Sequence, residues 1–296
     1  MSLIFVTGGG GFLGQHLIKA LQNANHEVIA PSSRECNLKD SNALNQVSAG
    51  QVFDAVFHLA AWTQAGDFCL RFPGDQWLIN QAINLNLLDW WFRKQPQAKL
   101  ITIGTSCSYP EEGTLSEDRY LEGSPTKSLF TYAYTKRMLY QGTVALAQQY
   151  GLDALTVVPS TLYGPGYHTD GKQLHFIFDL ARKIRLGALG KADVVLWGDG
   201  NQRRELIHVD DFVKDLLSLF DLNCSGLVNI GAGCDFSIRE FATMLSDLVG
   251  FDPSLIYYDE KAYVGARSKV LNISKLKGLL GSINRIDLST GLRTIL

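Results

Sequence analysis

The stretch Thr7–Gly14, which reads TGGGGFLG, constrains the fold of this 296-residue chain more than any other feature. The apolar run Leu3–Val6 precedes it and is short and β-branched enough to form a buried strand. After it, Leu13, Leu17 and Leu21 recur every four residues, which places them on one face of a helix. A strand that enters a glycine turn and opens directly into a helix presents backbone N–H groups and the positive helix end to a phosphate. The stretch therefore predicts a nucleotide site.

The spacing of the glycines refines this prediction. Gly8, Gly11 and Gly14 form a GxxGxxG pattern, one residue away from the GxGxxG fingerprint of dinucleotide sites. Gly8 and Gly11 would let the backbone turn and approach a pyrophosphate, and Gly14 would let the helix pack close to the strand. The alternative is a glycine-rich turn that binds no ligand.

Charge and cysteine usage exclude several classes of protein. The formal net charge is −2 and no run of basic residues occurs, so neither nucleic acid nor an anionic membrane surface is an expected partner. The five cysteines are scattered and lack CxxC pairs, so we expect neither a disulfide framework nor a metal site. No apolar stretch reaches the ~18–20 residues of a membrane span, and no signal peptide is recognisable. These features predict a soluble protein of the reducing cytoplasm.

Short apolar runs alternate with helical patterns through the first half of the chain. Strands are expected at Glu27–Ala30, Ala55–Leu59, Leu100–Ile103 and Leu155–Val158, and a long helix at Gln76–Arg93. This alternation predicts an α/β fold of Rossmann type, with a doubly wound parallel sheet whose ligand crevice lies beyond the carboxyl ends of the strands.

The alternation lapses after the segment Pro159–Pro165, and we expect a smaller substrate domain there. The run Gly226–Ile230 reads as a strand that returns to the main sheet, so the two domains are expected to interleave. The predicted division assigns 1–163 and 206–231 to the dinucleotide domain, and 164–205 and 232–296 to the substrate domain.

The end of the second expected strand bears on the choice of cofactor. An NAD site usually carries an acidic residue there for the ribose hydroxyls, whereas this chain has Ser32, Ser33 and Arg34. Small hydroxyls and an arginine suit a 2′-phosphate, so NADP(H) is expected in preference to NAD(H). The alternative is that these residues form an exposed turn without a ligand.

Tyr132 and Lys136 form a YxxxK pair. A spacing of four residues puts both side chains on one helical face, about one turn apart. A neighbouring ammonium favours the phenolate, so we expect a lowered pKa for Tyr132, which could then exchange a proton near neutral pH. The alternatives are an amphipathic helix with an incidental pair and a role for Tyr134 in place of Tyr132.

Together with these motifs, several others make the chain resemble the extended short-chain dehydrogenase/reductases that act on nucleotide sugars, the NAD-dependent epimerase/dehydratase family. The resemblance spans nearly the whole chain. In order, it rests on the three glycines, His58–Ala61, Asn80, Thr105, the Tyr132/Lys136 pair, Pro159–Pro165 and the segment Arg204–Asp211 with the sequence RELIHVDD.

The resemblance implies roles for individual residues. Thr105 takes the place of the hydroxyl that hydrogen-bonds the substrate oxygen. Lys136 takes the place of the lysine that also binds the nicotinamide ribose, and Arg204 takes the place of an arginine that binds the nucleotide phosphates. It also implies a homodimer formed through the helix that bears Tyr132 and the neighbouring helix. The expected cofactor contacts are Gly8, Gly11, Phe12, Leu13, Gly14, Ser33, Arg34, Asn37, Leu38, Leu59, Ala60, Ala61, Tyr132, Lys136, Pro159 and Leu162.

Within the family, the sequence resembles the GDP-L-fucose synthases, which epimerise C3 and C5 of a GDP-4-keto-6-deoxy sugar and then reduce C4 with NADPH. The segment Thr105–Pro110, TSCSYP, resembles their SSCIYP, with Cys107 at the epimerisation cysteine and His175 where the second acid/base stands. Lys183, Trp197 and Arg204 occupy places of nucleotide contacts. Dehydratases instead carry Asp and Glu directly after the catalytic threonine, so a 4,6-dehydratase is not expected.

The chemistry of epimerisation agrees with this pattern. Inverting a carbon beside a ketone needs a base on one face and an acid on the other, in addition to Tyr132. Cys107 and His175 are such groups, and a nearby imidazolium or other cation would favour the thiolate. The alternatives are a small buried cysteine and a packed histidine, and His58 by itself also reads as a packed or capping residue.

The sequence therefore predicts an NADP(H)-dependent epimerase/reductase of a nucleotide-diphosphate 4-keto-6-deoxy sugar. One alternative keeps the fold but performs a single reaction, either C4 reduction or redox-neutral epimerisation with bound NAD. A more remote alternative is a regulatory protein that binds a dinucleotide without catalysis; retention of Thr105, Tyr132 and Lys136 argues against it.

Overall fold

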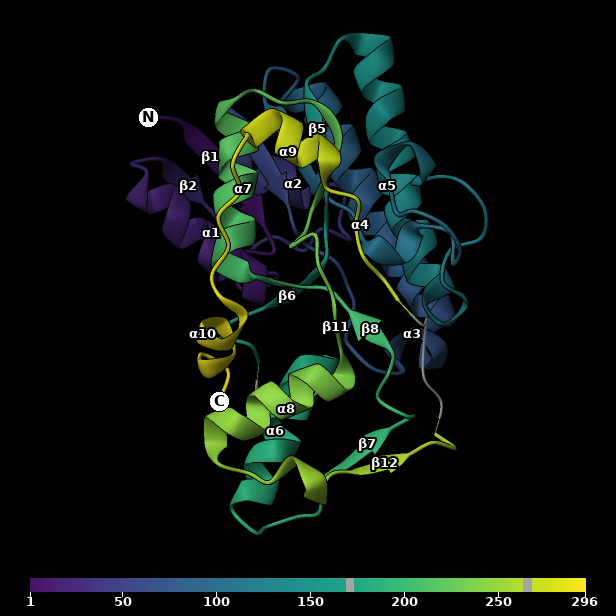
Figure 1. The fold of residues 1–296 in the computed structure, drawn as a ribbon. Helices are drawn as coiled ribbons and strands as arrows, with labels where there is room; N and C mark the ends of the chain where they lie inside the picture. The colour runs from purple at the N-terminus through teal and green to yellow at the C-terminus, as the bar shows by residue number, and fades with distance from the viewer. Residues whose placement is uncertain (169–172, 263–267) are drawn as a thin grey trace.

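The computed structural model describes residues 1–168, 173–262 and 268–296. Their centre is a parallel sheet with the strand order β10-β5-β4-β3-β1-β2 (Figure 1). The chain winds outward from β1 to β2 on one side and from β3 through β5 to β10 on the other, so the switch point lies between β1 and β3. The strands are β1 (Leu3–Thr7), β2 (Glu27–Ile29), β3 (Ala55–His58), β4 (Lys99–Ile103), β5 (Ala154–Pro159) and β10 (Gly226–Ile230).

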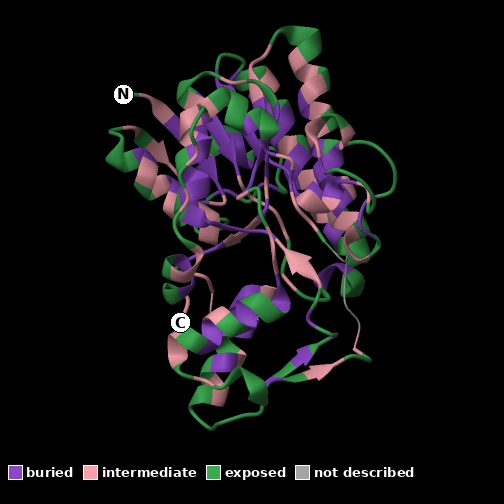
Figure 2. Ribbon diagram, in the orientation of Figure 1, coloured by how far each residue is buried: buried purple, intermediate pink, exposed green. Residues whose placement is uncertain are grey.

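Helices cover both faces of this sheet, and Figure 2 shows its strands as the most buried part of the molecule. Successive residues of a strand point to opposite faces: Ile4 and Val6 pack in one hydrophobic cluster and Phe5 in the other. The first face carries α1 (Phe12–Asn23), α7 (Val209–Asp221) and α9 (Ser274–Leu280); the second carries α2 (Ala43–Ser48), α4 (Pro73–Lys94) and α5 (Phe130–Tyr150). This doubly wound arrangement is the predicted fold class.

A smaller lobe lies below the sheet in Figure 1 and has its own apolar cluster. It contains α6 (Phe176–Ala188) and α8 (Ile238–Val249), beside the parallel pair β7 (Val195–Trp197) and β12 (Tyr257–Asp259), and α10 (Leu288–Arg293) packs on α8. Two further strand pairs connect the lobes: β6 (Thr161–Tyr163) with β9 (Leu206–His208), and β8 (Arg203–Arg204) with β11 (Phe236–Ser237).

Several short helical turns lie between the main helices and strands. The stretch between β3 and α4 contains the single turn α3 (Phe68–Arg71), and the Phe68 ring packs 4.7 Å from the Trp62 ring. Contacts of this kind join residues that no local periodicity relates, which is why the turn was not predicted. The 3₁₀ turns η1 (Ser106–Ser108), η2 (Glu117–Arg119), η3 (Lys127–Leu129) and η4 (Pro253–Leu255) belong to the same class.

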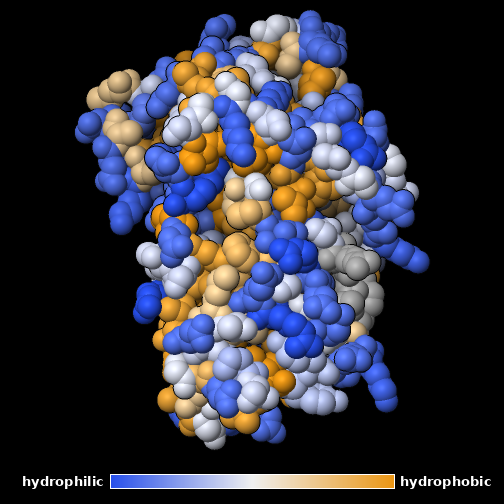
Figure 3. All heavy atoms as spheres, in the orientation of Figure 1, coloured by the Kyte–Doolittle hydropathy of each residue, from blue (hydrophilic) through white to orange (hydrophobic). Residues whose placement is uncertain are grey.

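The face of the molecule in Figure 3 shows hydrophilic and hydrophobic side chains interspersed. Among the helices of the described residues, none combines the length and the apolar character that crossing a bilayer requires.

Candidate functional site

The glycine turn after β1 forms a backbone cradle at the switch point of the sheet. Gly8 has φ +74°, and a Cβ at this position would lie 2.7 Å from the backbone nitrogen of Ala60. Gly14 packs directly on the backbone of Gly8 and Gly9, so a side chain there would push α1 away from β1. The first and third glycines of the motif are therefore required by close approach, as the spacing suggests.

The first turn of α1 opens toward this cradle. Its N-cap is Gly11, which has no side chain to accept hydrogen bonds from the turn, and the turn carries no acidic residue. The Gly11 N–H itself donates to Gly8 O at 3.0 Å, which closes the loop. Phe12 and Leu13 follow, both half-buried. Free N–H groups and a positive helix end suit a pyrophosphate, so the cradle fits a dinucleotide.

The segment after β3 lies against the glycine turn and is held from two sides. The Ala60 N–H donates to Thr7 Oγ1 at 3.3 Å. Asn80 of α4 accepts from the Trp62 N–H at 2.8 Å and donates to the Trp62 carbonyl at 3.0 Å. Leu59, Ala60 and Ala61 are half-buried beside the cradle, where small side chains leave room for a flat ring. Asn80 thus has a positioning role that the sequence motif alone does not reveal.

The residues predicted for the adenosine end lie after β2. Ser33, Arg34 and Asn37 are exposed, whereas the Leu38 side chain is buried in the core, which leaves only its backbone for a ligand. The carboxylate of Glu35 accepts from the Ser32 N–H at 2.8 Å, and this hydrogen bond lowers its pKa. Because the acid turns back to the backbone, Arg34 remains the cation of this turn.

Pro159 and Leu162 are the last predicted cofactor contacts. Pro159 ends β5 and Leu162 lies in β6, and both are half-buried. They belong to the same carboxyl edge of the sheet as the glycine cradle.

Tyr132 and Lys136 lie one turn apart on α5, as predicted, but their electrostatics differ from the prediction. Desolvation raises the pKa of Tyr132, with the Cys107 charge as the next contribution, and desolvation lowers the pKa of Lys136 to about 8. The expected lowering of the Tyr132 pKa by Lys136 is therefore wrong for the protein without ligands, because burial raises this pKa and Lys136 is not among the groups that shift it. Within the described residues neither the Tyr132 hydroxyl nor Lys136 Nζ has a hydrogen-bond partner, so both can meet a cofactor and substrate.

Tyr134 belongs to a different environment. Its ring packs 4.6 Å from that of Phe130, and the Arg137 guanidinium lies 5.5 Å from its centre. Tyr134 is thereby engaged in packing, which leaves Tyr132 as the tyrosine that faces the site.

His58 lies at the carboxyl end of β3 and is fully buried. Its Nδ1 lies 2.8 Å from Thr7 Oγ1 and its Nε2 lies 3.2 Å from Asn84 Oδ1. Desolvation and the nearby Lys136 charge lower its pKa to about 3, so the imidazole is neutral. It packs beneath the site, as the sequence suggested.

Thr105 and Cys107 are fixed by the turn η1. The Thr105 hydroxyl accepts from the Cys107 N–H at 3.3 Å, and Ser108 Oγ donates to Ala133 O on α5 at 3.1 Å. Arg137 Nε donates to the Ser108 carbonyl at 2.8 Å, so the turn is attached to α5 twice. This attachment brings Cys107 near enough to Tyr132 for its charge to act on the phenol.

His175 is the N-cap residue of α6, and its Nδ1 is buried without a hydrogen-bond partner among the described residues. Desolvation, followed by the charge of Arg204, lowers its pKa to about 4. The imidazole is therefore neutral near pH 7. An imidazolium at His175 as the cation beside Cys107 is consequently wrong for the protein without ligands.

Of the predicted substrate contacts, the structure brings Arg204 to this cluster. Arg204 lies on β8, and its charge acts on both Cys107 and His175. Lys183 lies farther into the smaller lobe, where Nζ donates to Val195 O and pairs with Asp179, each at 3.2 Å. Trp197 ends β7 and is 61% exposed. Lys183 and Trp197 thus lie near each other in the smaller lobe.

A profile of the NAD dependent epimerase/dehydratase family matches residues 4–231. The chain belongs to this family. It is 28% identical to a GDP-L-fucose synthase of Azorhizobium caulinodans over 98% of the chain and 94% of the relative. A GDP-L-fucose synthetase of Naegleria fowleri solved with NADP shares 23% identity at a TM-score of 0.86, covering 99% of this chain and 92% of that one. A GDP-mannoheptose C4 reductase of Campylobacter jejuni with NADP shares 24% sequence identity at a TM-score of 0.87. The match covers 99% of this chain and 96% of that one.

Membership of the epimerase/dehydratase family confirms that the chain is an enzyme and confirms the predicted resemblance. The structural relatives confirm the fold. In this fold the segments of the smaller lobe come before and after β10 in the chain.

One residue in contact with Cys107 has no counterpart in the sequence prediction. Lys269, in the segment before α9, places Nζ 3.7 Å from Cys107 Sγ and 2.8 Å from Thr126 Oγ1. A lysine 162 positions from the cysteine gives no local signal of proximity. Only the folding of the last 30 residues over the site brings them together.

Proposed function

We propose that the protein is an NADPH-dependent epimerase/reductase of a nucleotide-diphosphate 4-keto-6-deoxy sugar, similar in reaction to GDP-L-fucose synthase. The observation that carries the proposal is that Cys107 lies near enough to Tyr132 to act on its phenol, while the charge of Arg204 acts on both Cys107 and His175. A simple reductase needs only the tyrosine pair, whereas epimerisation needs groups on both faces of the sugar.

In the reductive step, Tyr132 donates the phenolic proton to the C4 oxygen, and Thr105 supplies a hydrogen bond to the same oxygen. The bound dinucleotide supplies the hydride. The raised pKa of Tyr132 keeps this group protonated before the reaction, which is the form a general acid requires. Lys136 holds the ribose hydroxyls through the ammonium that has no protein partner among the described residues.

In the epimerisation steps, Cys107 as thiolate removes the proton beside the ketone. The C–H bond breaks, its electron pair moves to the C4 oxygen as an enolate, and an S–H bond forms. His175 then returns a proton from the opposite face. Desolvation and then Arg204 lower the His175 pKa, so a diphosphate on Arg204 would offset the second of these causes and help to protonate the imidazole.

The nucleotide would extend from the cluster into the smaller lobe, with Arg204 at the diphosphate and Lys183 and Trp197 farther along. An exposed indole and a lysine suit a purine and a phosphate. The GDP-linked relatives support a guanine nucleotide. NADP(H) is favoured over NAD(H) by Arg34 and by the NADP found in the two related structures.

We also propose a homodimer that forms through α4 and α5, which pack side by side. Leu78 and Leu85 of α4 are each 68% exposed and lie seven residues apart on one face. Phe130 and Met138 of α5 are each 48% exposed. Apolar side chains exposed on two adjacent helices suit burial against a second copy.

The domain division belongs to the same proposal: 1–163 with 206–231 binds the dinucleotide, and 164–205 with 232–296 binds the sugar nucleotide. The placement of β10 in the main sheet and of α6 and α8 in the smaller lobe supports it. All five cysteines are free, which favours the cytoplasm as the place of action.

The test separates the two activities on one substrate. The protein is incubated in D₂O with GDP-4-keto-6-deoxymannose and without cofactor, and deuterium at C3 and C5 is followed by NMR. NADPH is then added and its oxidation is recorded. We expect deuterium at both carbons before NADPH and stoichiometric oxidation afterwards.

Variants sharpen the assignment. Cys107→Ser and His175→Asn should suppress deuterium uptake, and both should still reduce an already epimerised 4-keto sugar. NADPH oxidation without any deuterium would identify a single-activity C4 reductase, the reaction for which the Campylobacter relative is named. Turnover without NADPH oxidation would identify a redox-neutral epimerase.

A further inference from the structure

Among the described residues, the groups around Cys107 include cations and no anion. Those whose charges interact with Cys107 are Tyr132 on α5, Tyr120 after η2, Cys69 on α3 and Arg204 on β8. The pKa values of Tyr132, Tyr120 and Cys69 are all raised, chiefly by burial, so these three groups are neutral near pH 7. Arg204 is a cation whose charge also acts on Cys107.

Lys269 is the cation in direct contact. Its Nζ lies 3.7 Å from Cys107 Sγ, within the range of an N–H···S hydrogen bond, and donates to Thr126 Oγ1 at 2.8 Å. Thr126 is buried, and its N–H donates to the Cys107 carbonyl at 3.3 Å. No carboxylate pairs with Lys269 anywhere in the described part of the chain. Its charge is therefore available to the sulfur.

The backbone around Lys269 is anchored on both sides. Ser268 Oγ donates to Asp235 Oδ2 at 3.1 Å, and the Leu271 N–H donates to the buried carboxylate of Glu205 at 2.8 Å. The Asn272 N–H continues the attachment by donating to Leu115 O at 3.0 Å. These hydrogen bonds fix the backbone on both sides of Lys269, so the fold places its side chain against Cys107.

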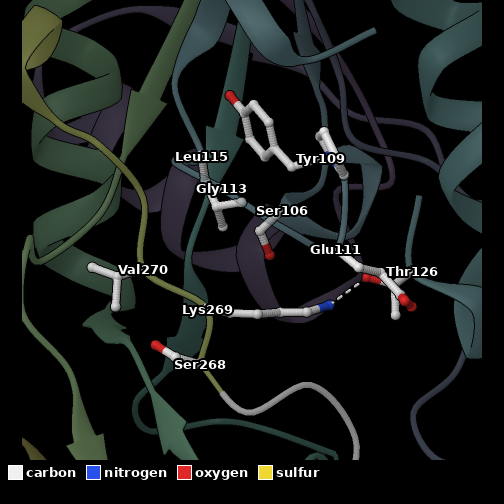
Figure 4. Close-up of a pocket in the computed structure, with 10 residues that line it drawn as sticks. Ser106, Tyr109, Glu111, Gly113, Leu115, Thr126, Ser268, Lys269 and Val270 are labelled. Carbon is white, nitrogen blue, oxygen red and sulfur yellow. Dashed lines mark hydrogen bonds between the residues drawn. The ribbon is translucent and has the colours of Figure 1, made fainter. Parts of the chain in front are cut away.

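A polar cavity of about 350 Å³ lies beside the lysine, between the turn η1 and residues 268–270. Figure 4 shows Lys269 extending across it toward Thr126, with Ser106 and Glu111 among the other lining residues. Glu111 Oε1 accepts from the Lys127 N–H at 2.8 Å and does not pair with Lys269. A polar space of this size beside Lys269 admits water.

We propose that Lys269 is a positioning residue that holds Cys107 as the thiolate, the form that removes the substrate proton in epimerisation. This inference rests on the proposed function. Lys269 does not itself take up the substrate proton. Its ammonium donates one hydrogen bond to the sulfur, and a second hydrogen bond to Thr126 orients the ammonium. The role belongs to the epimerisation steps and leaves the hydride step unaffected.

The experiment compares Lys269→Met, Lys269→Arg and the control Lys277→Met, an exposed lysine on α9. Alkylation of Cys107 by iodoacetamide at pH 7 is followed by mass spectrometry of its peptide. We expect the rate to fall about tenfold in Lys269→Met, to recover at higher pH, and to stay within about twofold in Lys269→Arg and the control. Deuterium uptake at saturating substrate should fall in parallel, while reduction of the epimerised sugar stays unchanged. Thermal unfolding confirms that each variant is folded.

Two results would overturn the proposal. An unchanged alkylation rate in Lys269→Met would show that the ammonium does not stabilise the thiolate. Weakened GDP binding with normal deuterium uptake at saturation would assign Lys269 to the nucleotide instead. Absence of deuterium uptake in the unmodified protein would refute the proposed epimerisation, and the alkylation rates would still decide whether Lys269 acts on Cys107.

Discussion

The dinucleotide cradle and the sugar end of the site are built on different principles. The cradle consists of backbone: Gly8 and Gly14 permit close approach, and the first turn of α1 presents its N–H groups. The sugar end consists of side chains from separate segments, with Cys107 on η1, His175 at the start of α6 and Lys269 before α9. The cradle therefore depends on the space around its backbone, and the sugar end depends on the charges of its side chains.

The two ends should therefore respond to different changes. A backbone cradle is lost when a Cβ is added and is indifferent to pH. A cluster of side chains tolerates small changes of volume, but its chemistry depends on which groups are protonated. Substitutions at either end can test this contrast.

The largest effect is expected from Tyr132→Phe. Removal of a general acid costs about 10²–10⁴-fold in rate, so NADPH oxidation should fall by that factor. Deuterium uptake at C3 and C5 should stay within a few-fold, because Cys107 and His175 are retained. Steady-state absorbance and NMR provide the two measurements. Tyr134→Phe is the matched control, and equal loss in both variants would contradict the assignment of Tyr132 as the acid.

Gly8→Ala tests the cradle. The position combines φ +74° with a Cβ site 2.7 Å from Ala60 N, whereas a Cβ at Gly10 would meet nothing within 4 Å. We expect Gly8→Ala to lower the free energy of unfolding by about 1–3 kcal/mol and to weaken NADPH binding at least ~10-fold. Gly10→Ala should change the free energy of unfolding by less than about 0.5 kcal/mol. Calorimetry measures both quantities, and similar behaviour of the two variants would refute a cradle set by space.

The contrast also explains what the sequence could predict. The glycine turn, the strand before it and the helix after it are contiguous, so local spacing defines them completely. The pair Tyr132 and Lys136 is likewise local, and its placement on one helix face is as expected. Where the chemistry depends on burial, the same reasoning was wrong: the pKa of Tyr132 rises when the spacing alone suggests a fall.

Other features of the site depend on distant parts of the chain. The contact of Lys269 with Cys107 and the charge of Arg204 at His175 arise only after the smaller lobe and the C-terminal segment fold over the sheet. No periodicity encodes them. The resemblance to the family identified Cys107 and His175 as candidates, but it could not supply the protonation state of His175, which desolvation and then the charge of Arg204 determine.

His175 provides the pH test of the sugar end. Its pKa is lowered to about 4, first by desolvation and then by Arg204. In the free protein the imidazole should therefore stay neutral down to about pH 5. Below pH 6.5 the unfolded chain takes up a proton at His175 that the folded protein does not, so the free energy of unfolding should fall on acidification. Bound GDP should increase the proton affinity of His175 about tenfold, because its phosphates offset Arg204. NMR titration with and without GDP measures this, with His175→Asn to assign the signal. A midpoint near 6.5 in the free protein would contradict it.

The smallest effect is expected from Arg34→Ala, at the one place where the dinucleotide end relies on charge. Arg34 is exposed in the turn after β2, so solvent screens its attraction for a 2′-phosphate, and we expect a loss of about 0.5–1 kcal/mol, or a rise of roughly 2–5-fold in KM for NADPH. The KM for NADH should not change, because that cofactor lacks the phosphate. Arg93→Ala, which removes an exposed arginine paired with Asp89 on α4, serves as the control. An equal rise for both coenzymes would mean that Arg34 supports the turn rather than the phosphate. Preference for NADPH would then have to come from Ser33 and the backbone. The dinucleotide end would in that case depend on the shape of the backbone here too, and not on charge.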